Sequence, residues 1–270
     1  MPTGNAALVP IAETVAHAYQ RTRPRARQER IDAEFAKAVK VADIEPRAPR
    51  GADRDHWKAA DEGGGAPADH ALVGSIGARG VVCDATSTEQ VGALAAQFGE
   101  VDVLVNAAGG LPEPAPECLP ILEAQLAQWH SSLAQNLLTA VLTTVAVQDK
   151  LTSISCVISV GSIGAERRGG SYGAAKAALA AWNTSLSADL TPRGVTCNVI
   201  SAGFVADTNF FRGQLVEERH LALVDETHNK RPGMVDDIAQ TAYFLASPGA
   251  RHITGQTIHV NGGTFITRWL

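Results

Sequence analysis

Tyr172 and Lys176 lie four residues apart in an alanine-rich segment. In a helix, this spacing places a phenol and an ammonium group on one face, one turn apart. Because a nearby ammonium group favours the phenolate, we expect Lys176 to lower the pKa of Tyr172 from its usual value of about 10. A tyrosine of this kind can donate or accept a proton at neutral pH. The spacing therefore predicts an acid/base pair, although the same short pattern also occurs in helices without any catalytic role.

Two serines precede this tyrosine. Ser162 lies ten residues before Tyr172, just after the strand-like segment 155–160, and Ser159 lies thirteen residues before it. A serine at the end of that strand can hold a substrate oxygen beside the phenol. The spacing alone leaves both serines open as the partner of Tyr172.

From about residue 80 onward, short apolar strands alternate with amphipathic helices. The expected strands are 80–83, 101–105, 156–160, 195–200 and 256–260, and the expected helices are 88–98, 126–148, 172–190 and 235–246. This alternation predicts an α/β fold, a Rossmann-like doubly wound parallel sheet with helices on both faces. Ligands of such sheets bind beyond the carboxyl ends of the strands. We therefore expect Asn106, Ser162 and Gly203, which each follow a strand, to meet in one crevice.

The first 80 residues follow this pattern less clearly. Residues 5–9 and 38–43 are candidate strands, 11–19 a candidate helix, and 46–70 a loop or weak helix rich in Pro, Gly, Ala, Asp and Arg. A basic run at 21–30 is either a solvated face or, through Arg23, Arg25 and Arg27, a phosphate contact. We expect one domain over 1–270, with a divergent part at 5–80 that contains an insertion around 21–37.

Composition narrows the classes of function. The net charge of −5 argues against a general nucleic-acid surface, and no apolar run reaches the roughly 18 residues of a membrane span. The N-terminus has no secretory pattern, so we expect a cytoplasmic protein. The cysteines are widely spaced and three lie in apolar runs, which predicts buried free thiols. The scattered histidines predict no metal site.

With these segments placed, the chain resembles the short-chain dehydrogenase/reductase family, well over about 80–264 and faintly over 5–45. The segment 106–109 resembles the family's Asn-Asn-Ala-Gly motif, with Ala107 in place of the second Asn. The segment 201–205, followed by Thr208, resembles the loop that closes over the nicotinamide, with Ala202 where proline is usual. The segment 254–263 resembles the C-terminal strand and turn. A Ser-to-Tyr spacing of thirteen is common in the family, but the context of Ser162 resembles the family motif better than that of Ser159.

The resemblance implies roles for individual residues. Tyr172 would be the general acid or base, Lys176 would lower its pKa and bind the nicotinamide ribose, and Ser162 would orient the substrate oxygen. Asn136 would hold a water that links Lys176 to solvent; alternatively, it only satisfies a break in a long helix. The implied cofactor contacts are Asp43, Asp84, Ala85, Asn106, Ala107, Ala108, Gly109, Tyr172, Lys176, Gly203, Val205 and Thr208. Asp43 would favour NAD over NADP, because a carboxylate repels a 2′-phosphate.

The chain departs from the family at the first strand–helix junction. The usual Thr-Gly-x-x-x-Gly-Ile-Gly motif lets backbone N–H groups approach the pyrophosphate, whereas this chain continues from Val9 through Pro10, Ile11 and Ala12. A second glycine-containing segment at 74–80 is better interpreted as a turn than as a phosphate loop. The binding of a dinucleotide is therefore the open point of the resemblance.

Three functions remain in view. The favoured one is an NAD- or NADP-dependent oxidoreductase that interconverts a small alcohol and a ketone or aldehyde. The alternatives are a family-fold protein that acts without dinucleotide as a lyase, isomerase or cyclase, and a non-catalytic binding partner. Gly110, Leu111 and the segment 204–215, with Phe210 and Phe211, predict an apolar substrate pocket. The apolar helices, and the family, imply a homo-dimer or homo-tetramer.

Overall fold

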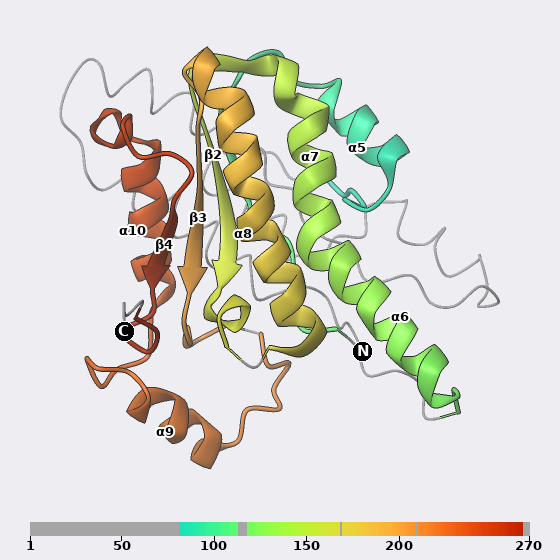
Figure 1. Cartoon of the computed structure of the whole chain (residues 1–270), viewed down its shortest axis with the longest axis vertical. Helices are drawn as coiled ribbons and strands as arrows, with labels where there is room; N and C mark the ends of the chain where they lie inside the picture. Colours follow the sequence, from blue (N-terminus) through green and yellow to red (C-terminus); the bar gives the residue numbers. More distant parts are fainter. Residues whose placement is uncertain (1–80, 113–117, 168, 209, 267–270) are drawn as a thin grey trace.

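The computed structural model describes residues 81–112, 118–167, 169–208 and 210–266. Its centre is a four-stranded sheet in the order β1–β2–β3–β4, with every pair parallel (Figure 1). The strands are β1 (Val101–Asn106), β2 (Leu151–Ser162), β3 (Thr196–Ala202) and β4 (Thr257–Val260). Parallel strands need crossover connections, and helices supply them here. The predicted α/β class and doubly wound sheet are thus confirmed.

The α-helices are α5 (Thr88–Ala95), α6 (Ile121–Leu133), α7 (Thr139–Val147), α8 (Gly170–Leu190), α9 (Glu217–Asp225) and α10 (Val235–Ala246). A π-helical turn, η1 (Ala134–Leu138), joins α6 to α7. Short 3-10 turns are η2 (Gln148–Lys150), η3 (Ile163–Ala165), η4 (Thr191–Arg193) and η5 (Pro248–Ala250). In this part of the chain, no helix is both long and apolar enough to cross a bilayer.

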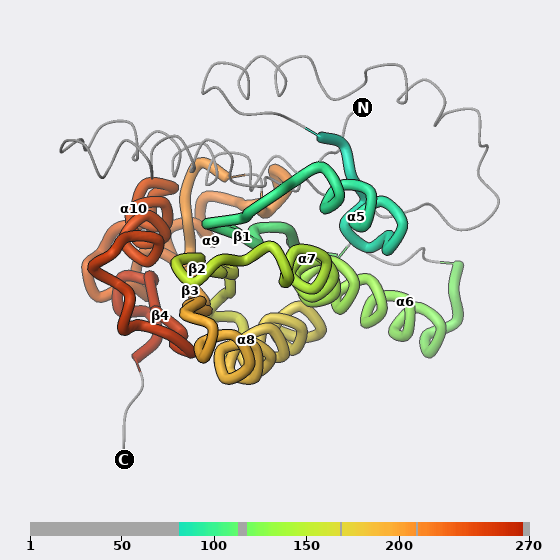
Figure 2. The backbone as a smooth tube through the Cα atoms, turned by 90° about the horizontal axis from the view of Figure 1, so that it is seen from above, coloured from blue at the N-terminus to red at the C-terminus, as the bar shows by residue number. Residues whose placement is uncertain are grey.

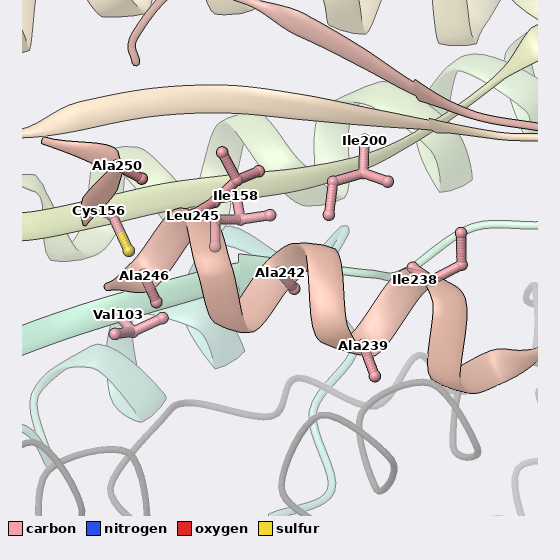
Figure 3. Packing of buried hydrophobic residues seen from close by; sticks show 10 residues of the cluster. All are labelled: Val103, Cys156, Ile158, Ile200, Ile238, Ala239, Ala242, Leu245, Ala246 and Ala250. Atoms are coloured by element: carbon pink, nitrogen blue, oxygen red, sulfur yellow. The ribbon is translucent and has the colours of Figure 1, made fainter. Parts of the chain in front are cut away.

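Both faces of the sheet are covered by helices, and β2 shows why. Side chains alternate along a strand, so neighbouring residues enter different cores. Ile158 packs with α10 in one cluster, whereas Val157 packs with residues of α7 and α8 in another. Figure 2 shows the sheet between α10 on one side and α7 and α8 on the other. Figure 3 shows the α10 side, where Ile238, Ala242 and Leu245 face the strands.

Several element predictions need correction. Residues 81–83 contain a single β-bridge, at Val82, instead of a strand. The single helix expected over 126–148 begins earlier, at Ile121, and is interrupted by η1. The sequence reasoning missed α9, whose apolar residues are sparse and half exposed. The candidate strands, helix, insertion and basic run within 5–80 lie outside the described residues, as does Asp43.

The cysteines agree with the prediction made from their surroundings. Cys83, Cys156 and Cys197 are buried, Cys118 is exposed, and all four are free thiols. Burial raises the pKa of Cys156 and of Cys197 to about 12 in each case, so both remain protonated at neutral pH. These thiols therefore serve as small core residues rather than as nucleophiles.

Candidate active site

The first turns of α8 carry both members of the predicted acid/base pair. Tyr172 is 9% exposed and Lys176 only 4% exposed. The Lys176 Nζ donates a hydrogen bond of 2.9 Å to the main-chain oxygen of Val160, near the end of β2. This bond fixes the ammonium group at the carboxyl end of the sheet, one helical turn from the phenol. A buried lysine needs a partner of this kind, because burying an unpaired charge costs several kcal/mol.

Ser162, rather than Ser159, is the serine that reaches the tyrosine. The Ser162 side chain lies close enough to the Tyr172 phenol to lower its pKa, and a Cβ on Gly164 would meet both side chains. Its Oγ also accepts a hydrogen bond of 3.1 Å from the Gly164 N–H, which begins η3. Ser159 is fully buried three residues earlier in the strand, where its Oγ accepts from the Asn106 side-chain amide at 3.4 Å. The geometry thus separates the two serines that spacing had left open.

The pKa of Tyr172 differs from the expectation drawn from its spacing to Lys176. Burial raises the pKa of Tyr172 to about 12, and the hydrogen bond with Ser162 lowers it by a smaller amount. Loss of hydration disfavours the charged phenolate, and in this site it outweighs the favourable effects. The expected lowering of the pKa was therefore wrong in direction. At neutral pH the group is a protonated phenol, the form that a general acid requires.

Asn136 lies in the π-helical turn η1 and is 1% exposed. Its Oδ1 accepts a hydrogen bond from the Gly110 N–H at 3.0 Å, while its Nδ2 donates to the oxygens of Gly110 at 2.9 Å and Ser132 at 3.1 Å. The amide therefore satisfies a carbonyl at the helix irregularity and also braces the loop after β1. Its expected role in holding a water remains a prediction.

Gly109 lies where the loop after β1 passes over Asn136 and Lys176. Its φ is +136°, a conformation that favours glycine. A Cβ at this position would lie 2.4 Å from the Asn136 Oδ1 and 3.1 Å from the Lys176 Nζ. The backbone itself, rather than a side chain, thus forms this wall beside the ammonium group.

The remaining candidate cofactor residues occupy two places. At the end of β1, the Asn106 Nδ2 donates to the Thr144 Oγ1 at 3.0 Å, and Ala107 and Ala108 are half-buried. Before α5, the Asp84 carboxylate accepts from the N–H of Thr86 at 2.9 Å and from its hydroxyl at 2.6 Å. Ala85 is fully buried in the cluster under α5, and its cofactor contact remains a prediction.

After β3, the chain forms the loop that was expected to cover the site. Gly203 N–H donates to the Val260 oxygen at 3.0 Å, and Val205 forms a bridge with Gly233. The Thr208 hydroxyl donates to the Val205 oxygen at 3.2 Å. These bonds hold the loop between β3 and α9, beyond the carboxyl ends of the strands (Figure 1).

An aromatic cluster in this loop covers Tyr172. The Phe210 ring meets the Tyr172 ring edge-on, with centroids 5.6 Å apart, and Phe211 meets Phe210 at 5.1 Å. The Arg212 Nη2 donates to the Leu111 oxygen at 2.9 Å, which joins this loop to the loop after β1. Sequence reasoning placed Phe210 and Phe211 in the pocket wall, but it missed this bridging arginine.

Sequence reasoning also missed a link between the two helices of the site. The hydroxyl groups of Ser132 in α6 and Ser171 in α8 are 2.8 Å apart, and both are buried. Their positions in the sequence could have indicated this contact, because Ser171 directly precedes Tyr172 and Ser132 lies one helical turn before Asn136. Among the residues that the structure describes, no group of three or more His, Cys, Asp or Glu side chains is placed to bind a metal.

Comparison with known proteins identifies the class of protein. A family model described as enoyl-(acyl carrier protein) reductase matches residues 59–264. The chain is 31% identical over 237 residues to the 3-oxoacyl-(acyl-carrier-protein) reductase FabG of Escherichia coli strain K12, which covers 86% of this chain and 94% of that protein. The chain thus belongs to the short-chain dehydrogenase/reductase family and is a short-chain oxidoreductase.

Solved structures are also similar to this chain. A 7α-hydroxysteroid dehydrogenase in complex with NADH and 7-oxo glycochenodeoxycholic acid has a TM-score of 0.63 and 27% identity, covering 73% of this chain and 79% of that one. A blue fluorescent protein from a metagenomic library, in complex with NADPH, has a TM-score of 0.62 and 32% identity, covering 72% and 81%. Both similarities extend over about three quarters of the chain.

Proposed function

We propose that this protein is an NAD- or NADP-dependent oxidoreductase that reduces a small ketone or aldehyde to an alcohol, with Tyr172 as the proton donor. One observation carries the proposal. The Tyr172 phenol lies beside the Ser162 side chain and one helical turn from Lys176, at the carboxyl end of the sheet. The names of two relatives support a ketone substrate, since one is a 3-oxoacyl reductase and the other was solved with a 7-oxo steroid.

In the reducing direction, the proposed roles follow from the protonation of each group. The Ser162 hydroxyl donates a hydrogen bond to the carbonyl oxygen and stabilises the negative charge that develops on it. Tyr172, protonated at neutral pH because burial raises its pKa to about 12, then transfers its proton to that oxygen. The Lys176 ammonium group, held by the Val160 oxygen, stabilises the phenolate that remains.

The residues at the end of β1 fit the nicotinamide half of a dinucleotide. Gly109 packs directly against Asn136 and the buried Lys176 ammonium group, so the loop after β1 lies beside the group proposed to bind the ribose. Asn106, Ala107, Ala108, Gly203, Val205 and Thr208 would surround this half, and Asp84, Ala85 and Asp43 the adenosine half. When bound, the nicotinamide would supply the hydride for the reduction. Asp43 favours NAD, and the NADH and NADPH complexes of the relatives leave that choice open.

Titration of NADH and NADPH against the purified protein tests this proposal. We expect cofactor fluorescence to report saturable binding, tighter for NADH, followed by turnover of a panel of small apolar ketones. The aromatic cluster of Phe204, Phe210 and Phe211 near Tyr172 supports the choice of apolar substrates. An absence of binding at millimolar cofactor would remove the proposal.

A second candidate function follows from the missing glycine motif. Pro10, Ile11 and Ala12 stand where the family places glycines that approach the pyrophosphate. A protein without dinucleotide binding would use Tyr172 for acid/base chemistry alone, as a lyase, isomerase or cyclase. Turnover that depends on Tyr172 but is unchanged after complete removal of nucleotide would favour this second candidate over the first.

We also propose that the chain folds as one domain and associates with copies of itself. The first part of α6 supports association, because Ile121 and Leu122 are 78% and 80% exposed and Leu126 and Trp129 are also exposed. Monomeric proteins seldom expose such a continuous apolar stripe. Sedimentation of the full chain distinguishes a monomer from a dimer or tetramer.

A further inference from the structure

The connection between Ser162 and Tyr172 is short and contains several glycines. It spans ten positions, and within it or at its edges lie Gly161, Gly164, Gly169, Gly170 and Gly173. The 3-10 turn η3 occupies Ile163–Ala165, and α8 begins at Gly170. Because this connection between β2 and α8 is short, η3 must pack closely against α8. The glycines determine how closely it does so.

Gly164 is in contact with both reactive side chains and with the helix. Its N–H donates to the Ser162 Oγ at 3.1 Å. A Cβ on Gly164 would lie 3.2 Å from Cε1 of the Tyr172 ring and 3.3 Å from the Ser162 Oγ, so this Cα faces the space between the two residues. The carbonyl of the same residue points to the first turn of α8.

Gly169 and Gly173 allow that carbonyl to reach the helix backbone. A Cβ on Gly173 would lie 2.3 Å from the Gly164 oxygen, and a Cβ on Gly169 would lie 2.4 Å from the same oxygen. Contacts this short with main-chain atoms cannot be relieved by a side-chain rotation. Any residue larger than glycine at position 173 must therefore push η3 away from α8, and Ser162 precedes η3 directly.

We propose that Gly164, Gly169 and Gly173 form a positioning device for the reaction, which sets the separation between the Ser162 hydroxyl and the Tyr172 phenol. The three glycines, called here the glycine seat, contact no substrate themselves. They act by letting η3 lie directly on the first turn of α8, so that a ten-residue connection brings the two side chains together on either side of Gly164. The inference rests on the proposed function for its kinetic consequences, but the separation itself is a structural quantity.

The test uses two substitutions in the full-length protein. Gly173→Ala introduces a methyl group against the Gly164 carbonyl and should lift η3. Gly164→Ala places a methyl group between Ser162 and Tyr172 without a backbone clash. This variant tests the proposal even if Gly173→Ala fails to fold. For each we expect kcat of ketone reduction to fall by about 10- to 100-fold, the effect of misplacing a reacting group by roughly 1 Å. KM should change by less than about threefold, because the aromatic residues proposed to bind the apolar substrate stay in place.

Two glycines provide matched controls. A methyl group on Gly92 in α5 would meet no atom within 4 Å, so Gly92→Ala should leave kcat unchanged. Gly170 has a φ of +55° and open space around it, so Gly170→Ala should lower Tm through backbone strain without moving η3. Equal kinetic losses in Gly170→Ala and Gly173→Ala would mean that the losses come from destabilisation alone, and would overturn the proposal.

A double-mutant cycle and a crystal structure complete the test. If the glycine seat acts through Ser162, adding Gly173→Ala to Ser162→Ala should cause little further loss of kcat, whereas additive losses would contradict it. Crystal structures of the wild type and of Gly173→Ala or Gly164→Ala give the Ser162 Oγ to Tyr172 Oη separation without any assay. We expect this separation to increase in the variants, and an unchanged separation would refute the glycine seat. If the wild type shows no turnover, the proposed function is refuted. The crystal structures would still show whether the three glycines set the separation between Ser162 and Tyr172.

Discussion

Helix α8 and the α6–α7 pair lie side by side on one face of the sheet, and each delivers a residue to the candidate site (Figure 1). They do so in different ways. Gly170–Leu190 is one unbroken helix, so helix geometry sets the one-turn relation between Tyr172 and Lys176. The α6–α7 pair is interrupted by a π-helical turn, and Asn136 reaches the site from that interruption.

This difference separates local from long-range positioning. The relation between Tyr172 and Lys176 requires α8 and a carbonyl at the end of β2. Asn136 depends on Gly110, which is 26 residues earlier in the chain, for two of its hydrogen bonds. Irregular helical turns are frequent at functional sites because they direct side chains that a regular helix cannot. Substitutions in α8 should therefore mainly change the rate of the reaction. Substitutions in η1 should mainly change the position of the loop after β1.

The largest effect is expected from Tyr172→Phe. Removing the phenolic hydroxyl removes the proposed proton donor while keeping the ring that contacts Phe210. Loss of a general acid lowers kcat by about 10²- to 10⁴-fold. Steady-state kinetics of ketone reduction measures this, and Tm should change little. Tyr243→Phe in α10 is the matched control and should retain activity; a similar small loss in both variants would argue against Tyr172 as the acid.

Asn136→Ala should cause the largest loss of stability. It leaves the N–H and oxygen of Gly110 and the oxygen of Ser132 without their amide partner. Unsatisfied buried groups cost about 1–3 kcal/mol each, so we expect about 2–4 kcal/mol after partial relaxation. Urea unfolding measures this. Gln135→Ala is the control next to it in η1, where the side-chain amide donates to the Ser131 hydroxyl, and it should cost less than about 1 kcal/mol. Equal losses of stability in the two variants would show that η1 tolerates no substitution, and that the loss in Asn136→Ala does not come from its hydrogen bonds to Gly110.

Alkaline pH should destabilise the protein through Tyr172. In the unfolded chain the phenol ionises near pH 10, whereas burial raises its pKa to about 12 in the folded state. Between these values the unfolded state loses a proton that the folded state retains, so the free energy of unfolding falls as pH rises from about 10 to 12. The two-unit difference corresponds to about 2–3 kcal/mol.

Comparison with Tyr172→Phe isolates this contribution. The buried thiols of Cys156 and Cys197 also have raised pKa values, so alkali also destabilises the folded protein through them. This contribution is the same in the wild type and in Tyr172→Phe. Urea unfolding at several pH values should therefore show a steeper decline in the wild type than in the variant above pH 10. Parallel curves would mean that Tyr172 ionises without hindrance in the folded state.

The difference between local and long-range positioning also explains which features could be predicted from the sequence. The bounds of α10 were predicted correctly, and those of α8 nearly so, because long periodic segments carry their own signal. A helix break at Asn136 was one alternative left open, but the π-helical turn itself was not predicted, since four of the five residues in 134–138 are common helix formers. The sequence context already favoured Ser162 over Ser159, whereas the raised pKa of Tyr172 depends on burial, which spacing does not reveal.

The smallest expected effect concerns the direct contact between the two helices. The buried hydroxyls of Ser132 and Ser171 are 2.8 Å apart; Ser171 directly precedes Tyr172, and Ser132 lies four residues before Asn136. Ser132→Ala, Ser171→Ala and the double variant form a cycle, for which we expect a coupling energy of about 1 kcal/mol by urea unfolding. The kinetic cycle is more informative than the stability cycle. If the bond transmits the position of η1 to α8, either single variant should lower kcat by about two- to fivefold, which corresponds to roughly 0.4–1 kcal/mol. A coupling energy near zero with unchanged kcat would mean that α8 presents Tyr172 independently of its neighbour, so that Asn136 influences the reaction only through the loop after β1.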